Sequence, residues 1–216
     1  MKKLQNLLIC FSCVVVLVLS GCASKSAKPP ALPTEKSAQK MSPEKLWETH
    51  LRYLQKMQNW QMEGRIAATQ GQEGGNASFV WRQMGESYQI KFFGPFGAGS
   101  VSVNGSPKQV SLKESDGKVH HAQTAEELMK KVAGWHVPLT GIRYWMLGIP
   151  TPKTKVQAQH INAKGHLNQL QQLNWIIDFS DYQNNHSVPI PSKLHMENGP
   201  LKVKIIVKSW KDLSAG

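Results

Sequence analysis

The chain has 216 residues and a formal net charge of +12, with 26 Lys and Arg against 14 Asp and Glu. This length fits one domain behind a leader. The three cysteines, Cys10, Cys13 and Cys22, all precede the predicted domain, which excludes disulfides, cysteine metal sites and cysteine nucleophiles within it. The basic balance favours an anionic membrane surface or an acidic partner, with plain solubility as the alternative.

The N-terminus predicts a lipoprotein signal peptide over residues 1–21. Lys2 and Lys3 precede an apolar run over residues 7–19, which is shorter than the roughly 20 residues of a transmembrane helix. Leu19-Ser20-Gly21-Cys22 then has the form of a lipobox, so Cys22 is the predicted lipidation site. An ordinary secretory signal is the alternative. Export in either form argues against nucleic acid as a partner.

Residues 22–42 predict an acylated N-terminus and a flexible tether, because Lys, Ser, Ala and Pro dominate them. Twenty such residues have an r.m.s. span of about 25 Å. A folded domain is expected over residues 43–216. It opens with a helix capped by Ser42, whose apolar stripe is Trp47, Leu51, Leu54 and Met57.

From Trp60 the apolar residues alternate with polar ones, which predicts strands with one apolar face. The expected strands of this antiparallel meander are 60–68, 77–81, 88–92, 101–103 and 110–112, then a short one at His120-His121. Two helices follow, at 124–132 with a capping box and at about 140–147. Strands are expected again at 167–170, 173–179, 194–196 and 201–207. This order predicts a mainly β fold with α-helices, an open curled antiparallel sheet capped by helices over an apolar interior.

Catalytic and metal sites are not expected. The sequence has no Gly-x-Ser-x-Gly elbow, no His-Glu-x-x-His and no phosphate-binding glycine loop. His120 and His121 are adjacent in a strand, so their rings point to opposite faces and make a poor metal pair. No catalytic residue, metal ligand or cofactor is therefore assigned.

One loop departs from the usual polar composition of turns. Phe92-Phe93-Gly94-Pro95-Phe96-Gly97-Ala98-Gly99 carries a single Phe at the tip of a Gly- and Pro-rich turn. Phe96 either folds back onto the core or enters a lipid or a partner groove.

Gly94-Pro95-Phe96-Gly97 resembles the (Asn/Gly)-Pro-Leu-Gly loop of the LolB family of outer-membrane lipoprotein receptors. The segment from Val137 to Pro150, with Pro138-Leu139, Arg143, Trp145, Leu147 and Gly148, is similar to that family's Ile-Pro-Leu…Leu-Arg-x-Trp-x-Leu-Gly-x-Pro segment. Gly64-Arg65-Ile66-Ala67, Phe79-x-Trp81, Trp175, Pro191-x-x-Leu194 and Trp210 extend the resemblance over nearly the whole mature chain.

The resemblance implies an open, unclosed antiparallel β-barrel capped by helices around a hydrophobic cavity. It implies a monomer, lipid-anchored in the outer membrane and facing the periplasm, which receives lipoproteins from the carrier LolA. Their acyl chains then pass to the inner leaflet of the outer membrane. Pro95, Phe96 and Gly97 match the family's membrane-insertion loop, with Phe96 at the position where Leu is usual.

Inward strand and helix residues provide candidates for the wall of an acyl cavity, although the same residues suit a filled core. They are Phe79, Trp81, Tyr88, Ile90, Trp145, Leu147, Trp175, Ile177 and Phe179. Two other functions fit an anchored envelope protein: a lipid-modifying enzyme, or a structural accessory of an outer-membrane assembly.

Overall fold

The computed structural model describes residues 31–34, 37, 40–94, 99–134, 137–184 and 186–216. The predicted signal peptide, the lipidation site Cys22 and most of the tether lie outside the described residues. So do Pro95, Phe96 and Gly97 of the predicted insertion loop.

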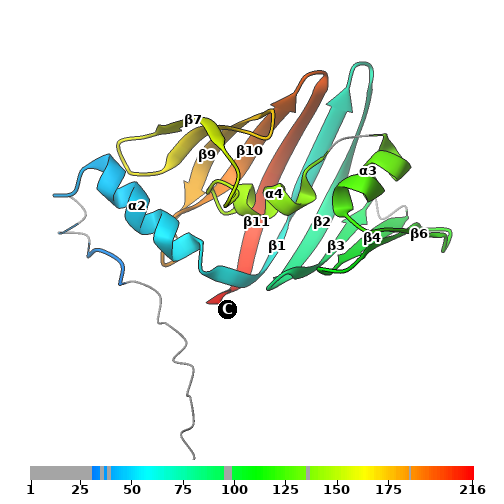
Figure 1. Cartoon of the computed structure of the whole chain (residues 1–216), viewed down its shortest axis with the longest axis horizontal. Coiled ribbons are helices and arrows are strands. Elements are labelled where there is room, and N and C mark those ends of the chain that lie inside the picture. Colours follow the sequence, from blue (N-terminus) through cyan, green and yellow to red (C-terminus); the bar gives the residue numbers. More distant parts are fainter. Residues whose placement is uncertain (1–30, 35–36, 38–39, 95–98, 135–136, 185) are drawn as a thin grey trace, which may run out of the picture.

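Eleven antiparallel strands form one sheet in the order β6-β5-β4-β3-β2-β1-β11-β10-β9-β8-β7 (Figure 1). The sheet consists of two meanders, β1 to β6 and β7 to β11. They are joined by the β1–β11 ladder, which runs from the pair Met57 and Ala215 to the pair Gln70 and Leu201. Strands β6 and β7 form the two edges, so the sheet is open, as predicted. The strands are β1 (Met57–Gln70), β2 (Glu73–Met84), β3 (Ser87–Phe93), β4 (Ser100–Gly105), β5 (Val110–Lys113), β6 (Val119–Ala122), β7 (Val156–Ile161), β8 (Leu167–Gln172), β9 (Trp175–Gln183), β10 (Ile190–Asn198) and β11 (Leu201–Ala215).

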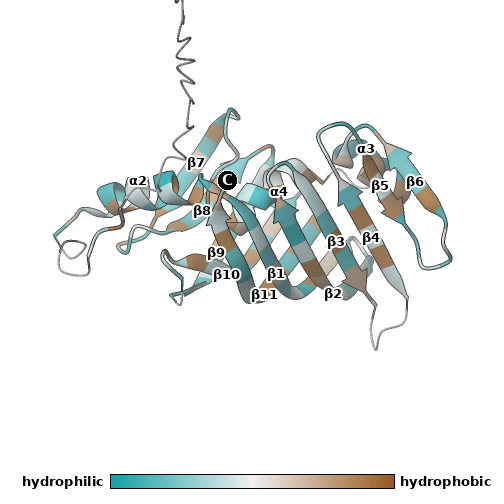
Figure 2. Ribbon diagram, turned by 90° about the horizontal axis from the view of Figure 1, so that it is seen from below, coloured by the Kyte–Doolittle hydropathy of each residue, from teal (hydrophilic) through white to brown (hydrophobic). Residues whose placement is uncertain are grey.

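Three helices lie along one face of this sheet, as the view from below shows (Figure 2). They are α2 (Pro43–Leu54), α3 (Ala125–Ala133) and α4 (Leu139–Met146). The Ser42 side chain accepts from Lys45 N at the start of α2, and Thr124 accepts from Glu127 N at the start of α3, as the sequence predicts. Helix α4 has no side-chain cap at Pro138. Its position depends on tertiary packing.

The structure differs from the predicted elements at several places, including the following three. Met57 belongs to β1 rather than to the helical stripe of α2. Leu173 lies in the β8–β9 turn with a positive φ of 55° and 38% of its surface exposed, so the prediction that it faces inward was wrong. Strand β11 continues to Ala215, well beyond the predicted end at Val207, because it pairs with β1 along that whole length.

The inward faces of the strands meet in one continuous core. Within it, the Trp60 ring lies near the start of β1, with its centroid 5.3 Å from those of both Trp81 and Trp210. Gly64 faces the same core, where a β-carbon would lie 2.3 Å from the Ile206 carbonyl oxygen and 2.9 Å from the Phe79 ring. A glycine is required there because strands β1 and β11 approach closely beside Phe79.

Helix α2 contacts the turn between β7 and β8, in the half of the sheet that contains β7 to β10. A ring nitrogen of His50, Nδ1, lies 3.1 Å from the Gly165 carbonyl oxygen. Gly165 has a φ of 68°, and a β-carbon there would lie 2.4 Å from Leu46 Cβ. The adjacent His166 ring stacks on Tyr182 at 4.4 Å and lies 5.7 Å from the His50 ring.

This histidine pair should make the domain less stable in acid. Burial, with the charges of His50 and Lys164, lowers the pKa of His166 from 6.5 to about 4, and burial lowers the pKa of His50. Below pH 6.5 the unfolded chain therefore binds protons at these two histidines that the folded domain does not yet bind. The stability is present above pH 6.5 and is lost as the pH falls towards 4.

We expect the free energy of unfolding to fall by about 1–2 kcal/mol over this range, after allowance for solvent screening of the ring. Urea melts at several pH values measure it. His166→Gln should flatten the dependence, whereas His121→Gln, which removes an exposed histidine from β6, should leave it unchanged. If the free energy of unfolding of His166→Gln fell as steeply with pH, other groups would be responsible for the loss of stability in acid.

Candidate functional site

An apolar pocket of about 300 Å³ lies between the sheet and the helices α3 and α4. Its wall combines the inward faces of β1 to β5, β10 and β11 with one side of α4 and with Met129 of α3. Every residue in this wall is apolar. They are Met62, Ile66, Ala68, Phe79, Trp81, Ile90, Phe92, Val101, Val103, Leu112, Met129, Val137, Leu139, Ile142, Met146, Met196, Val203 and Ile205. The volume is at the lower end of the range of about 300–1,000 Å³ for ligand pockets.

The wall is deeply buried at one end of the pocket and half-exposed at the other. The half-exposed residues are Ile66, Ala68, Phe92, Val101, Met129 and Leu139. Phe92 pairs with Val101 in the β3–β4 ladder, one pair before its end at Phe93 and Ser100. The pocket therefore opens at the end of the sheet from which the 94–99 loop leaves.

Three of the nine predicted cavity residues line this pocket: Phe79, Trp81 and Ile90. Tyr88 lies beside it, with its ring 6.2 Å from that of Trp81. Its ring occupies the space that a β-carbon of Gly105 would need. Burial, with the charge of Glu126, raises the pKa of the Tyr88 phenol to about 12.

The other predicted cavity residues lie outside the apolar wall. Trp175, Ile177 and Phe179 are buried on β9, in the other half of the core. Trp145 is fully buried against Trp175, with the two rings 6.3 Å apart. Leu147 faces a different pocket. The sequence therefore identified apolar positions but did not separate the pocket wall from filled core.

A buried amide holds Trp145 and the start of the following segment. Gln172 Oε1 accepts from Trp145 Nε1 at 3.0 Å and from Thr151 N at 2.9 Å. Its Nε2 donates to the carbonyl oxygens of Thr151 at 2.9 Å and Thr154 at 3.1 Å. Gln172 is fully buried, and all four hydrogen-bonding positions of its amide are used. No motif in the sequence pointed to this residue.

Several residues of the wall were not among the predicted candidates. Ile66, Val203 and Ile205 sit on predicted inward faces, so their alternation was an available signal. Ile142 and Met146 face the pocket from α4, at helical spacing from Leu139. Four methionines, Met62, Met129, Met146 and Met196, contribute to the wall. Their unbranched side chains adapt to irregular shapes.

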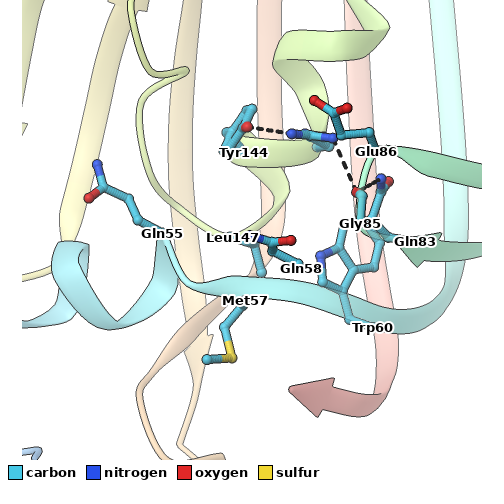
Figure 3. A pocket seen from close by; sticks show the side chains of 10 residues that line it. Gln55, Met57, Gln58, Trp60, Gln83, Gly85, Glu86, Tyr144 and Leu147 are labelled. Carbon is cyan, nitrogen blue, oxygen red and sulfur yellow. Dashed lines mark hydrogen bonds between the residues drawn. The ribbon is translucent and has the colours of Figure 1, made fainter. Parts of the chain in front are cut away.

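A second pocket, of about 470 Å³, lies on another side of α4 and has a mixed lining (Figure 3). Arg143 Nη1 donates to the Gly85 carbonyl oxygen at 3.3 Å, and Nη2 donates to the Tyr144 hydroxyl. Gln55, Gln58, Gln83 and Glu86 supply further polar groups. Polar groups in such numbers are unsuited to a hydrocarbon chain. The apolar pocket is therefore the candidate site.

Residues 58–210 match the family model described as "Outer membrane lipoprotein LolB". The chain belongs to the LolB family. The outer-membrane lipoprotein LolB of Cellvibrio japonicus is 31% identical over 212 residues, covering 96% of this chain and 98% of the relative. That of Francisella tularensis subsp. novicida is 33% identical over 211 residues, covering 97% and 96%. A LolA superfamily protein from Nitrosomonas europaea has a TM-score of 0.49 at 7% identity, covering 77% of this chain and 94% of its own.

Membership of the LolB family confirms the resemblance predicted from the sequence and the prediction that the chain is not an enzyme. Within residues 137–150, the LolB segment divides its side chains between sites: Leu139, Ile142 and Met146 face the apolar pocket, and Arg143 and Tyr144 face the polar one. None of the helices in the described part of the chain could span a membrane. The described residues also contain no group of three metal-ligating side chains.

Proposed function

We propose that this chain is an outer-membrane lipoprotein that receives other lipoproteins from the periplasmic carrier LolA. It then passes their acyl chains to the inner leaflet of the outer membrane. The observation that carries the proposal is the wholly apolar pocket that opens at the end of the sheet bearing the 94–99 loop. The names of its relatives support the membrane assignment.

The apolar wall matches the main energetic problem of moving an acylated protein through water. An acyl chain with some 14 buried methylenes is stabilised by about 11 kcal/mol, at about 0.8 kcal/mol per methylene. A receptor must replace much of that burial and still release the chain. Transfer then needs no nucleotide, only affinities that increase from carrier to receptor to membrane.

In this proposal, the acylated N-terminus, the tether and the 94–99 loop position the domain at the membrane. Cys22 carries the acyl anchor that holds the chain at the outer membrane, with the domain in the periplasm. The tether lets this monomeric domain reach both the carrier and the bilayer. Phe96, flanked by Pro95 and Gly97, enters the inner leaflet beside the mouth of the pocket and opens a path for the cargo.

Phe96→Glu should separate cargo binding from cargo delivery. A carboxylate resists transfer into hydrocarbon, so insertion of the loop is lost while the pocket wall is unchanged. We expect normal acceptance of a lipoprotein from the carrier and a delivery rate to liposomes reduced by about tenfold or more. Sedimentation of labelled cargo with liposomes measures delivery.

Phe96→Leu is the matched control, because it keeps an apolar tip and restores the residue usual in the family. It should deliver cargo at the parent's rate. Normal delivery by Phe96→Glu would contradict the role of the loop. Failure of both variants to accept cargo would show that the loop acts on binding instead.

A further inference from the structure

A third hollow, distinct from the two pockets beside α4, lies on the outer face of the sheet, opposite the face covered by α4. Its volume is about 510 Å³, and it spans β3, β2, β1 and β11. Small side chains, Ala67 and Ser78, form its floor, and Phe93 and Ile206 stand higher beside them. We call it the outer groove. It reaches Gly94, where the 94–99 loop begins.

Two cations line the outer groove, Arg65 of β1 and Lys204 of β11. Both are exposed. In the β1–β11 ladder Arg65 pairs with Ile206 and Ala67 pairs with Lys204, so the two cations are diagonal neighbours on one face. Such positions are about 7–8 Å apart, which lets both side chains reach one anion between them.

Three carboxylates on this side of the sheet pair with other cations, and a fourth, Asp178, accepts from Gln169 Nε2 at 2.7 Å. Glu63 pairs with Lys211 at 2.9 Å, Glu197 with Lys202 at 3.5 Å, and Asp181 with Lys193. Among the described residues, no carboxylate lies within 4.0 Å of Arg65 or Lys204. Residues 95–98 are Pro, Phe, Gly and Ala, so they add none. The charges of the outer groove are therefore available to a ligand.

We propose that the outer groove binds the phosphate of an anionic phospholipid headgroup in the membrane that receives the cargo. Arg65 binds the phosphate oxygens in a bidentate manner and Lys204 adds a point charge. Phe93 and Ile206 contact the apolar part of the lipid. The groove would thus fix the domain on the bilayer at the base of the insertion loop. This inference rests on the proposed function, which brings that loop to the membrane.

The test uses the processed, acylated protein, anchored by its own lipid in neutral phosphatidylcholine vesicles. Dense sucrose-loaded vesicles, either neutral or one-third phosphatidylglycerol, are then added, and the fraction of protein that co-sediments with them is measured. We expect binding to the anionic vesicles, weakened by high salt. Arg65→Gln with Lys204→Gln should reduce this binding by about 25-fold, at about fivefold for each cation.

Lys153→Gln with Lys155→Gln is the matched control. It removes the same net charge before the edge strand β7, four strands away from β11, and should keep nearly all of the binding. Equal losses in the two double variants would overturn the groove as a site, since only net charge would then matter. Equal binding of the parent to neutral and anionic vesicles would overturn it as well.

Cargo delivery is measured on the same vesicles to keep the two proposals apart. Failure of the parent to deliver cargo to any vesicle would contradict the proposed function. Co-sedimentation with the anionic vesicles would still test whether the outer groove binds lipid. A groove variant that docks normally but no longer accepts cargo from the carrier would assign the groove to an acidic protein surface. That result would overturn the lipid site.

Discussion

Ala68→Phe is expected to weaken binding of acylated cargo by about thirtyfold while the domain stays folded. Ala68 is half-buried at the rim of the apolar pocket, on the inward face of β1. A benzyl group there occupies the entrance of a pocket of only about 300 Å³. Excluding two or three methylenes of an acyl chain weakens binding by about 2 kcal/mol, or about thirtyfold. A fluorescent acyl probe and transfer from the carrier both measure the loss.

The matched control is Thr69→Phe, one residue further along β1. Thr69 is exposed on the outer face, so the same aromatic group there leaves the pocket open. It should bind cargo as the parent does. Overpacking at Ala68 costs about 1–3 kcal/mol, which a domain of ordinary stability tolerates, and thermal melts check this. Full cargo binding by a folded Ala68→Phe would show that acyl chains enter elsewhere.

Gln172→Leu should destabilise the domain by about 3–5 kcal/mol, the largest effect on stability expected here. The change leaves the Trp145 and Thr151 N–H groups and the Thr151 and Thr154 carbonyl groups without their partner. Each unsatisfied buried group costs about 1–3 kcal/mol, and relaxation recovers part of the sum. Urea denaturation measures the change.

Gln171→Leu makes the same chemical change one residue earlier, on the other face of β8, where the side chain is only half-buried. It should alter the free energy of unfolding by no more than about 0.5 kcal/mol. Similar small effects in both variants would mean that water replaces the Gln172 amide. That outcome would remove the amide as the group that positions Trp145 and α4.

Local patterns predicted the parts of this fold whose cause is local. The caps at Ser42 and Thr124 act within one turn of their helices, so residue type and spacing were sufficient. The alternation in 201–207 placed Val203, Ile205 and Val207 inside and Lys202 and Lys204 outside, as the structure confirms. Strand faces follow from the two-residue period alone.

Long-range pairing explains the errors. Met57 fits the stripe of α2, but it begins β1 because it pairs with Ala215 at the far end of the chain. Leu173 continues the alternation of β9, but the tight β8–β9 turn needs positive φ at both Leu173 and Asn174. A pattern of apolar residues contains no information about these partners.

The sequence by itself determined the mainly β domain, most of the inward faces and the membership of the LolB family. It also predicts a lipobox at Cys22, which lies outside the described residues. Only the tertiary structure decided which inward residues line a pocket. Phe79, Trp81 and Ile90 line the apolar pocket, whereas Trp175, Ile177 and Phe179 are buried in the core outside it. The difference arises because Trp145 of α4 packs on Trp175 in the β9 half, while Ile142 and Met146 leave space above β1 to β4. That volume depends on how α4 packs over the sheet, which no local period encodes.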